Sequence, residues 1–261
     1  MVKHITGAKL IEKKSLCPEH FFMRFISPEI ASEARTGQFV NILTGAEGVV
    51  LRRPFSFMRA NAGEGTFDII FRVVGAGTDW MSGLEPGDMI DILGPLGNGY
   101  NLERAGSKPC VVGGGVGIPP LIWVIEELHS KGKRPLVFLG GREAAHLFGL
   151  DEIRALGYEP VLATEDGSIG AHGFITLPLE KSIRPNEVTQ VYVCGRIEML
   201  RTITAWGGNI AGKIQVSLEC KMACGFGVCL GCAAPGRNGG YLHVCTDGPV
   251  FTLDQVDLSR M

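Results

Sequence analysis

The sequence predicts an antiparallel β-barrel, then a doubly wound parallel sheet, then a small cysteine-rich loop domain. Over the first hundred residues, short apolar runs alternate with Gly and Pro clusters, which is typical of a sandwich or small barrel. From Ser107, strand-like runs alternate with helical stretches, which is typical of a parallel α/β sheet. From Glu219 the chain is rich in Gly and Cys and has little periodicity. We expect three domains, over residues 1–103, 104–212 and 213–261.

The first region contains short runs rich in Phe, Ile and Val, which favour strands. Strands are predicted at His20–Ile26, Gln38–Leu43, Phe55–Met58, Phe67–Val74 and Met89–Leu93. The turn Glu85-Pro-Gly-Asp opens the last of them, and Thr78–Leu84 can form a short helix.

The second region combines buried-type strands with helical spacing of apolar residues. Strands are predicted at Pro109–Val112, Leu136–Leu139, Pro160–Ala163, Gln190–Val193 and Ile214–Leu218. Helices are predicted after Gly117, in parts of Glu143–Leu156, and at Ile197–Trp206.

The composition excludes several functional classes. The 261 residues are 45% hydrophobic and 20% charged, which is ordinary for a globular protein. The net charge is −2 and no block of like charges is present, so we expect no nucleic-acid partner. No apolar run has the length of a signal peptide core or a membrane span, so we expect a cytoplasmic protein without a membrane partner. Eight cysteines in such a chain are more often ligands or buried thiols than disulfides.

Four cysteines near the C-terminus form the most specific motif. Cys224, Cys229, Cys232 and Cys245 have the spacing C-x4-C-x2-C-x12-C, and the first three match the plant-type [2Fe-2S] ferredoxins. The sequence around the motif is rich in glycine, at Gly225, Gly227 and Gly231. Because glycine has no Cβ, backbone N–H groups there can turn toward the sulfurs. Structural zinc is the main alternative, but zinc sites usually pair two C-x2-C motifs. Redox-active disulfides are a third possibility. The motif favours a [2Fe-2S] cluster.

The remaining cysteines and a nearby histidine are expected to be structural. Cys220 lies close to the motif, but four cysteines already satisfy a cluster. Cys17 and Cys110 are expected to be buried small hydrophobic residues. His243 is expected to be a packing or surface residue, because a Rieske centre needs two histidines.

The barrel region carries residues suited to a flavin. Arg53 at the start of Arg53-Pro54-Phe55-Ser56 can fork onto a pyrophosphate, Phe55 can lie beside a flavin ring, and Ser56 can hydrogen-bond a ring nitrogen. The alternative is an edge strand that opens with Pro and needs no ligand. Downstream, Gly77 and Thr78 at a helix start can form an anion site. Together these pieces predict flavin binding.

The second region carries a glycine-rich turn suited to a nicotinamide dinucleotide. Gly114, Gly115 and Gly117 follow a predicted strand and precede a helix, although the segment is not a strict G-x-G-x-x-G. A tight βα turn without a ligand is the alternative. Cys194 ends a later strand, where ligands bind in open α/β sheets, and can border a nicotinamide ring. The acidic pair Glu165 and Asp166 can accept ribose hydroxyls and so favours NAD over NADP.

These motifs, in this order, resemble the ferredoxin–NADP reductase superfamily. The C-terminal cluster narrows the resemblance to the electron-transfer subunit of the two-protein, NAD-linked (type B) dihydroorotate dehydrogenases. The matching stretches cover nearly the whole chain and include Leu51–Ser56, Ile70–Val73, Ile92–Gly99, Val112–Gly117, Ser217–Glu219, Met222–Gly225 and Asp247–Phe251. Two departures are Arg196, where the family often has Pro after Cys-Gly, and Cys220, where the family usually has another residue.

The resemblance implies FAD, a [2Fe-2S] cluster and NAD(H) as cofactors. The family's FAD contacts fall on Arg53, Pro54, Phe55, Ser56, Ile70, Phe71, Arg72, Gly77 and Thr78. It also implies a partner, an FMN-containing dihydroorotate dehydrogenase catalytic subunit of pyrimidine biosynthesis, with two copies of each chain in a heterotetramer. Electrons would pass through the cluster and FAD to NAD⁺. No residue of this chain is an obvious general base for dihydroorotate, so no catalytic residue is assigned.

Two other functions stay open at this stage. The first is an equivalent flavin and iron–sulfur NAD(P)H reductase subunit of another redox complex, ferredoxin-linked or sulfide-linked. The second, from a different class, is a non-catalytic zinc-and-nucleotide sensor, which a visible absorption spectrum would distinguish.

Overall fold

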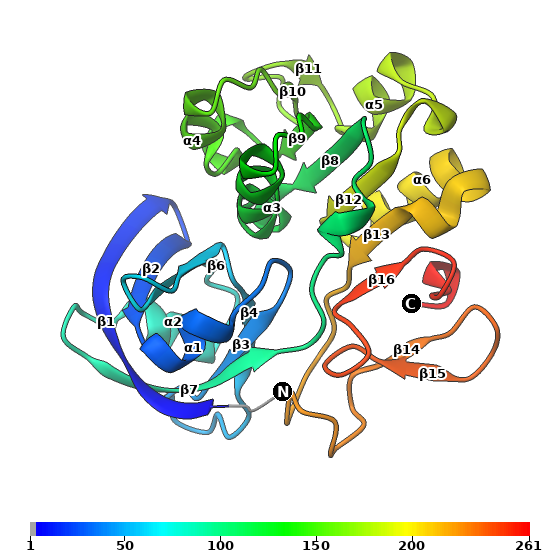
Figure 1. The fold of residues 1–261 in the computed structure, drawn as a ribbon. Helices are drawn as coiled ribbons and strands as arrows, with labels where there is room; N and C mark the ends of the chain where they lie inside the picture. The colour runs from blue at the N-terminus through cyan, green and yellow to red at the C-terminus, as the bar shows by residue number, and fades with distance from the viewer. Residues whose placement is uncertain (1–3) are drawn as a thin grey trace.

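Two seven-stranded sheets and a two-stranded sheet organise the computed structural model, which describes residues 4–261 (Figure 1). The first sheet is antiparallel and has the strand order β4-β3-β7-β1-β2-β6-β5. Its strands are β1 (His4–Cys17), β2 (His20–Ile26), β3 (Phe39–Ile42), β4 (Arg53–Ser56), β5 (Arg59–Asn61), β6 (Thr66–Arg72) and β7 (Met89–Leu96). Helices α1 (Pro28–Glu33) and α2 (Ala76–Ser82) lie between its strands in the chain, and the turn η1 (Leu102–Arg104) follows it.

The first sheet curls on itself around one apolar core. That core includes Leu10, Met23, Phe25, Ile42, Phe57, Phe67 and Ile92. Strand β4 stands at one end of the strand order and β6 near the other, yet the rings of Phe55 and Phe71 lie 5.7 Å apart between centroids. The two ends of the sheet therefore approach each other, which confirms the predicted antiparallel barrel.

The longest strand of this sheet, β1, was not predicted. Ala8 and Leu10 are buried, but the strand continues through Glu12, Lys13 and Lys14 with no further fully buried residue. Register shifts against β2 after Leu10 interrupt its alternation. A strand of this kind leaves no apolar period in the sequence, because its outer half faces solvent.

The second sheet is parallel apart from one edge strand. Its strands are β8 (Pro109–Gly114), β9 (Leu136–Gly141), β10 (Val161–Thr164), β11 (Ala171–His172), β12 (Gln190–Cys194), β13 (Ile214–Ser217) and β16 (Val250–Thr252). The order is β11-β10-β9-β8-β12-β13-β16, and only β16 pairs antiparallel in this sheet. Its helices are α3 (Pro119–Ser130), α4 (Leu150–Ala155), α5 (Thr176–Ser182) and α6 (Ile197–Gly207), with short turns η2 (Gly115–Gly117), η3 (Ala144–His146), η4 (Pro185–Glu187) and η5 (Gly208–Lys213).

Both faces of the second sheet are covered by helices (Figure 1). Val111 packs with Leu121 and Ile125 of α3 in one core. Its neighbours Cys110 and Val112 point the other way and pack with residues of α5 and α6. Because strand side chains alternate between faces, this division shows a doubly wound sheet, as predicted.

The cysteine-rich segment leaves the second sheet after β13 and returns to it at β16. Between them the chain passes beside the barrel and forms the hairpin β14 (Ala233–Pro235) and β15 (Tyr241–His243) (Figure 1). The chain closes with the turn η6 (Leu258–Arg260). Among the residues described, no helix is both long and apolar enough to cross a membrane.

Candidate functional site

The four predicted cluster cysteines lie in the segment between β13 and β16. Cys232 and Cys245 are buried, with their sulfurs 3.2 Å apart, whereas Cys224 is half-buried and Cys229 is exposed. Backbone N–H groups point at the sulfurs, from Cys229 to Cys224 at 3.5 Å, from Gly231 to Cys229 at 3.5 Å, and from Cys245 to Cys232 at 3.4 Å. Such donors offset negative charge on thiolates and on a bound cluster, so the loop fits a [2Fe-2S] group.

Two glycines of this loop have conformations and surroundings that exclude other residues. Gly225 and Gly227 have φ values of +80° and +88°, in the left-handed region. A Cβ on Gly225 would lie 2.5 Å from the side-chain nitrogen of Asn41, and one on Gly227 would lie 2.8 Å from Thr246. The backbone therefore approaches the barrel and the return segment closely.

The thiols of the loop differ in acidity. Burial raises the pKa of Cys224, but backbone N–H groups of Cys229, Phe226 and Val228 outweigh it and lower that pKa to about 6. In contrast, burial raises the pKa of Cys220 to about 12, and its sulfur faces the carbonyl oxygen of Cys232 at 3.8 Å. Cys220 is a neutral thiol beside the loop, which supports the structural role expected for it.

The two adjacent arginines at the flavin strand have different partners. Arg52 forms an ion pair with Asp91 at 2.8 Å. Arg53 donates to the carbonyl oxygens of Leu51 at 2.8 Å and Arg52 at 3.3 Å, and has no carboxylate partner within residues 4–261. All four residues of β4 are half-buried, on both faces of the strand. Arg53 is thus the arginine of this pair that has no carboxylate partner among the described residues, and its role at a phosphate stays a prediction.

Arg53 and Thr44 lie close to Gly77 at the start of α2. A Cβ on Gly77 would lie 3.3 Å from Nε of Arg53 and 3.4 Å from Oγ1 of Thr44. The Thr44 hydroxyl is buried, and no described residue hydrogen-bonds it. Thr78 shapes the turn, because its Oγ1 accepts from the backbone nitrogens of Val74 at 2.8 Å and Gly75 at 3.2 Å. The unpaired Thr44 hydroxyl fits a polar ligand such as the FAD pyrophosphate.

A surface cavity lies beside the start of α2. It has a volume of about 630 Å³ and is lined by Glu19, Arg72, Val73, Val74, Gly75, Ala76 and Asp79. Arg72 is paired with Glu19 at 2.9 Å. Phe71 does not line the cavity, since its buried ring packs between Phe21 and Phe55. From its place in the core, Phe71 can support the Phe55 ring. Ile70 is half-buried.

The glycine-rich turn after β8 lies against the end of β12. A Cβ on Gly117 would lie 2.5 Å from the carbonyl oxygen of Cys194, and one on Gly114 would lie 2.8 Å from Sδ of Met199. Gly115 has a φ of +55° and open space around it. The chain runs from β8 to β11 on one side and resumes at β12 on the other, so this is the switch point of the sheet. Dinucleotides bind at such a point in open α/β sheets.

Cys194 and the acidic pair lie along the same edge of the sheet. Cys194 is buried, and burial together with the charge of Glu219 raises its pKa well above the usual range of a thiol. Glu165 and Asp166 directly follow β10 and are exposed. A neutral thiol with an apolar character can border a ring, and exposed carboxylates can accept ribose hydroxyls.

Sequence reasoning missed Asn41 and Thr44. Asn41 is fully buried in β3, and its side-chain nitrogen donates to the carbonyl oxygen of Cys224 at 3.2 Å. A polar residue inside the apolar run Phe39–Ile42 was the only available signal. Cys110 is buried as expected. The expectation that Cys17 is buried is wrong, because Cys17 is half-buried at the end of the solvent-facing half of β1.

Three family models match the chain. The "iron-sulfur cluster binding domain of dihydroorotate dehydrogenase B" matches residues 219–257, the "oxidoreductase FAD-binding domain" residues 7–100, and the "oxidoreductase NAD-binding domain" residues 111–205. The chain is 34% identical over 256 residues to the dihydroorotate dehydrogenase B (NAD(+)) electron transfer subunit of Desulforamulus reducens, covering 97% of this chain and 98% of the relative. It is 37% identical over 254 residues to the Bacillus caldolyticus protein of the same name, covering 95% and 97%.

Solved structures show the same fold. The structure of an NADH-dependent reduced ferredoxin-NADP oxidoreductase, studied for flavin-based electron bifurcation, superimposes with a TM-score of 0.86 and 29% identity, covering 98% of this chain and 92% of that one. A ferredoxin NADP⁺ reductase from Neisseria gonorrhoeae superimposes with a TM-score of 0.67 and 20% identity, covering 81% and 97%.

Proposed function

The chain belongs to the family of electron transfer subunits of dihydroorotate dehydrogenase B, and on that premise we propose that it passes electrons from a partner dehydrogenase to NAD⁺. When bound, FAD exchanges a hydride with NAD⁺ and single electrons with a [2Fe-2S] cluster, so it supplies the link between two-electron and one-electron chemistry. The proposed domains are residues 1–103 for FAD, 104–212 for NAD and 213–261 for the cluster. β13 and β16 of the last segment complete the second sheet.

We propose that the chain holds its cofactors through residues of all three segments. The cluster ligands are Cys224, Cys229, Cys232 and Cys245. The FAD contacts are Arg53, Pro54, Phe55, Ser56, Ile70, Phe71, Arg72, Gly77 and Thr78, with the Phe71 ring acting through Phe55. The NAD contacts are Gly114, Gly115, Gly117 and Cys194. Each group is supported by geometry: backbone donors at the sulfurs, an unpaired Thr44 hydroxyl, and open backbone at Gly115.

One observation carries this function: hydrogen bonds join the three segments at or next to the proposed cofactor-binding residues. Asn41 of the flavin sheet donates to Cys224 of the cluster loop. Tyr100, which follows the barrel, donates its hydroxyl to the carbonyl oxygen of Val193 at 2.9 Å, one residue before Cys194. These contacts hold the proposed cluster, flavin and nicotinamide sites in fixed relative positions, which short-range electron transfer requires.

The cluster loop also presents a face for a partner. Phe226, Val228 and Leu230 are 43%, 72% and 57% exposed around the exposed Cys229. Exposed apolar side chains gathered around one functional residue are typical of a protein interface. We propose that an FMN-containing dihydroorotate dehydrogenase catalytic subunit docks here, in a heterotetramer with two copies of each chain.

A second candidate function is an equivalent subunit of another NAD(P)H-linked redox complex. Similarity to the reduced ferredoxin-NADP oxidoreductase structure over nearly the whole chain favours it, as does the exposed Arg196 beside Cys194 and Gly195. That residue alters the rim of the proposed nicotinamide site. The two functions differ in the electron donor that reaches the cluster.

The test compares two electron donors, dihydroorotate and reduced ferredoxin. The chain, with FAD and cluster loaded, is expected to reduce a dye with NADH by itself. Dihydroorotate-dependent reduction of NAD⁺ is expected only after addition of the FMN-containing dehydrogenase encoded in the same genome. If reduced ferredoxin supports NAD(P)⁺ reduction instead, and dihydroorotate with the dehydrogenase does not, the second function is correct. A colourless protein after reconstitution would exclude both.

A further inference from the structure

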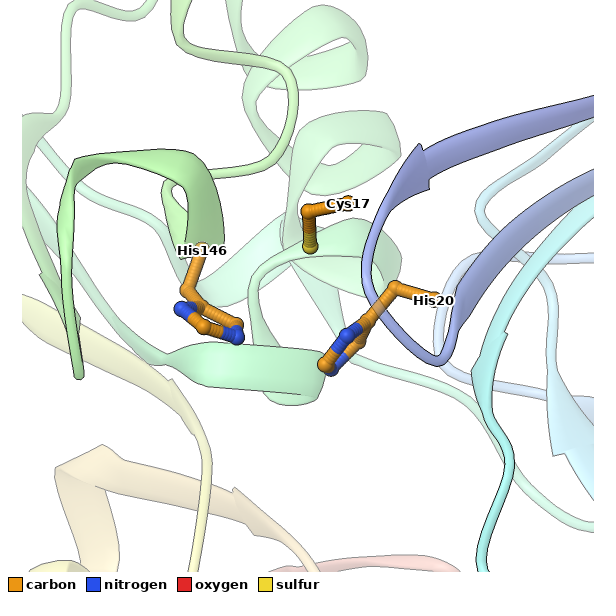
Figure 2. A group of neighbouring side chains, drawn as sticks. All are labelled: Cys17, His20 and His146. Atoms are coloured by element: carbon orange, nitrogen blue, oxygen red, sulfur yellow. The ribbon is translucent and has the colours of Figure 1, made fainter.

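A group of three side chains outside the proposed cofactor contacts has the composition of a metal site. Cys17 ends β1, His20 begins β2, and His146 ends η3 beside the second sheet (Figure 2). One ligand atom from each residue lies within 4.8 Å of the other two. Figure 2 shows the two imidazole rings side by side, with the Cys17 side chain pointing toward the space between them.

Both histidines have a ring nitrogen available for a ligand bond. Nδ1 of His20 lies 2.8 Å from the carbonyl oxygen of Pro18, so this nitrogen carries the proton and Nε2 keeps its lone pair. Nδ1 of His146 is buried, and no residue in the described part of the chain hydrogen-bonds it. The nearest carboxylate oxygen belongs to Glu143, at 3.6 Å. A carbonyl partner behind one ring and an unpaired nitrogen in the other are features of histidines that ligate metals.

The surroundings exclude most water from the two histidines. His20 is 4% exposed, and the side chain of His146 is 17% exposed. The ring of Phe148 lies 5.2 Å from His20 and 6.1 Å from His146, measured between centroids. The two histidine rings are 4.8 Å apart in an edge-to-face arrangement. An apolar wall of this kind strengthens a metal–ligand bond by lowering the local dielectric.

We propose that Cys17, His20 and His146 bind a zinc ion, with water in the fourth position. Zinc binds thiolate at about 2.3 Å and imidazole at about 2.0 Å, so tetrahedral ligand atoms lie roughly 3.3 to 3.7 Å apart. The present separations of up to 4.8 Å need a closure of about 1 Å, which the turn between β1 and β2 can supply. One sulfur and two nitrogens suit zinc, which accepts mixed ligands of this type.

The site would join the two large parts of the molecule. Cys17 and His20 belong to the flavin sheet, whereas His146 belongs to the connection between β9 and α4. Glu19, between the first two ligands, pairs with Arg72 at the rim of the cavity. A bound ion would therefore hold the β1–β2 turn against the second sheet, next to the proposed flavin cavity. The proposal does not depend on the identity of the electron donor.

The experiment measures zinc in protein that already holds FAD and its iron–sulfur cluster. Wild-type protein is dialysed against limiting Zn²⁺, and metal content is measured by mass spectrometry. We expect a single equivalent of zinc per chain, and at least a tenfold loss of affinity in Cys17→Ser and in His146→Ala. The exposed His172→Ala variant is the matched control and should bind as wild type. Cys229→Ser should also keep zinc, which separates this site from the cluster cysteines.

Two results would overturn the proposal. One is wild-type protein that binds no zinc, and the other is zinc that persists in Cys17→Ser and His146→Ala but disappears in Cys229→Ser. FAD content and thermal unfolding of each variant show whether it is folded. If a variant does not fold, X-ray absorption at the zinc edge of the wild-type protein identifies the atoms that bind the zinc. One sulfur and two nitrogen ligands support the site, and a sulfur-only shell contradicts it.

Discussion

The side-chain nitrogen of Asn41, in the middle of β3, donates a hydrogen bond of 3.2 Å to the backbone carbonyl oxygen of Cys224. Asn41 is fully buried, and the backbone of Gly225 passes so close that a Cβ there would lie 2.5 Å from the same nitrogen. This contact joins the flavin sheet to the first cysteine of the cluster loop. It fixes where the loop lies relative to β4, the strand that carries Arg53.

Asn41→Asp tests this junction, because it keeps the shape and removes the donor. A carboxylate would then face the Cys224 carbonyl and the negative charge of the cluster. We expect a loss of about 1–3 kcal/mol in stability, and slower electron exchange between cluster and flavin with unchanged NADH-to-dye activity. Rapid-mixing absorption measurements separate the two rates. Asn61→Asp, on the exposed edge of the same sheet, is the control. Equal effects in both variants would contradict the assigned junction.

The adjacent arginines should separate flavin binding from stability. Arg53→Ala removes the guanidinium that has no carboxylate partner, so FAD affinity should fall by about 30-fold, equivalent to roughly 2 kcal/mol. Arg52→Ala breaks the pair with Asp91 and should lower thermal stability while FAD remains bound. The FAD content of each variant is measured from the flavin released on denaturation after gel filtration, and the stability of each variant is measured by thermal unfolding. Retention of FAD by Arg53→Ala would refute the assigned flavin site.

The cluster loop gives a matched pair of cysteines. Cys229→Ser should abolish the visible absorption of the cluster and partner-dependent electron transfer, yet leave NADH-to-dye activity. Cys220→Ser should leave the cluster intact, because the Cys220 thiol is neutral and faces a carbonyl oxygen. Iron and sulfide analysis with electron paramagnetic resonance checks both variants. Loss of the cluster from Cys220→Ser would make Cys220 a ligand or a required neighbour.

Gly117→Ala should weaken NADH binding without affecting the other cofactors. The new Cβ would lie 2.5 Å from the Cys194 carbonyl oxygen, so the turn after β8 must move away from β12. The KM for NADH should rise on the order of tenfold, equivalent to roughly 1.4 kcal/mol. Gly208→Ala is the control, since its Cβ meets nothing within 4 Å and its φ of −56° suits alanine. A normal KM for Gly117→Ala would show that the dinucleotide does not bind at the turn after β8.

Arg59 joins the two large sheets through ion pairs. Its guanidinium pairs with Glu126 of α3 at 2.6 Å and with Glu152 of α4. Arg59→Ala leaves the half-buried Glu126 and the exposed Glu152 without their cation, which should cost on the order of 1–3 kcal/mol at neutral pH. Lys108→Ala, which loses only the exposed pair with Glu187, should change stability by less than about 1 kcal/mol.

The stability loss in Arg59→Ala should depend on pH. Burial raises the pKa of Glu126, and Arg59 partly offsets that effect. The folded state therefore binds the Glu126 proton more tightly than the unfolded state, and stability falls as pH rises from the unfolded pKa through the folded one. Without Arg59 the folded pKa rises further, so the variant should lose more stability than the wild type over the pH range above the ordinary pKa of a glutamate. Thermal unfolding across that range checks this, and parallel curves would contradict it.

Local patterns in the sequence determined much of this protein. The cysteine spacing from Cys224 to Cys245, the glycines after β8, and the change from short β runs to alternating strands and helices all lie within short stretches of chain. Their physical basis is local, because spacing decides which ligands can reach one ion and whether a backbone can turn. Family models for FAD-binding, NAD-binding and iron–sulfur domains match the chain, and the bounds of the three domains remain predictions. The individual FAD and NAD contacts remain predictions.

Only the tertiary structure decided the contacts between distant segments. The Asn41 bond to Cys224, the unpaired Thr44 hydroxyl beside Gly77, and the group formed by Cys17, His20 and His146 have no local pattern. Each depends on how the barrel closes and on how the second sheet packs against it. Strand β1 was missed for a related reason, since its outer half pairs with neighbours through backbone groups and buries few side chains. Hydrogen bonds and ligand sets assembled across the fold can be identified only once the chain's distant parts are placed together.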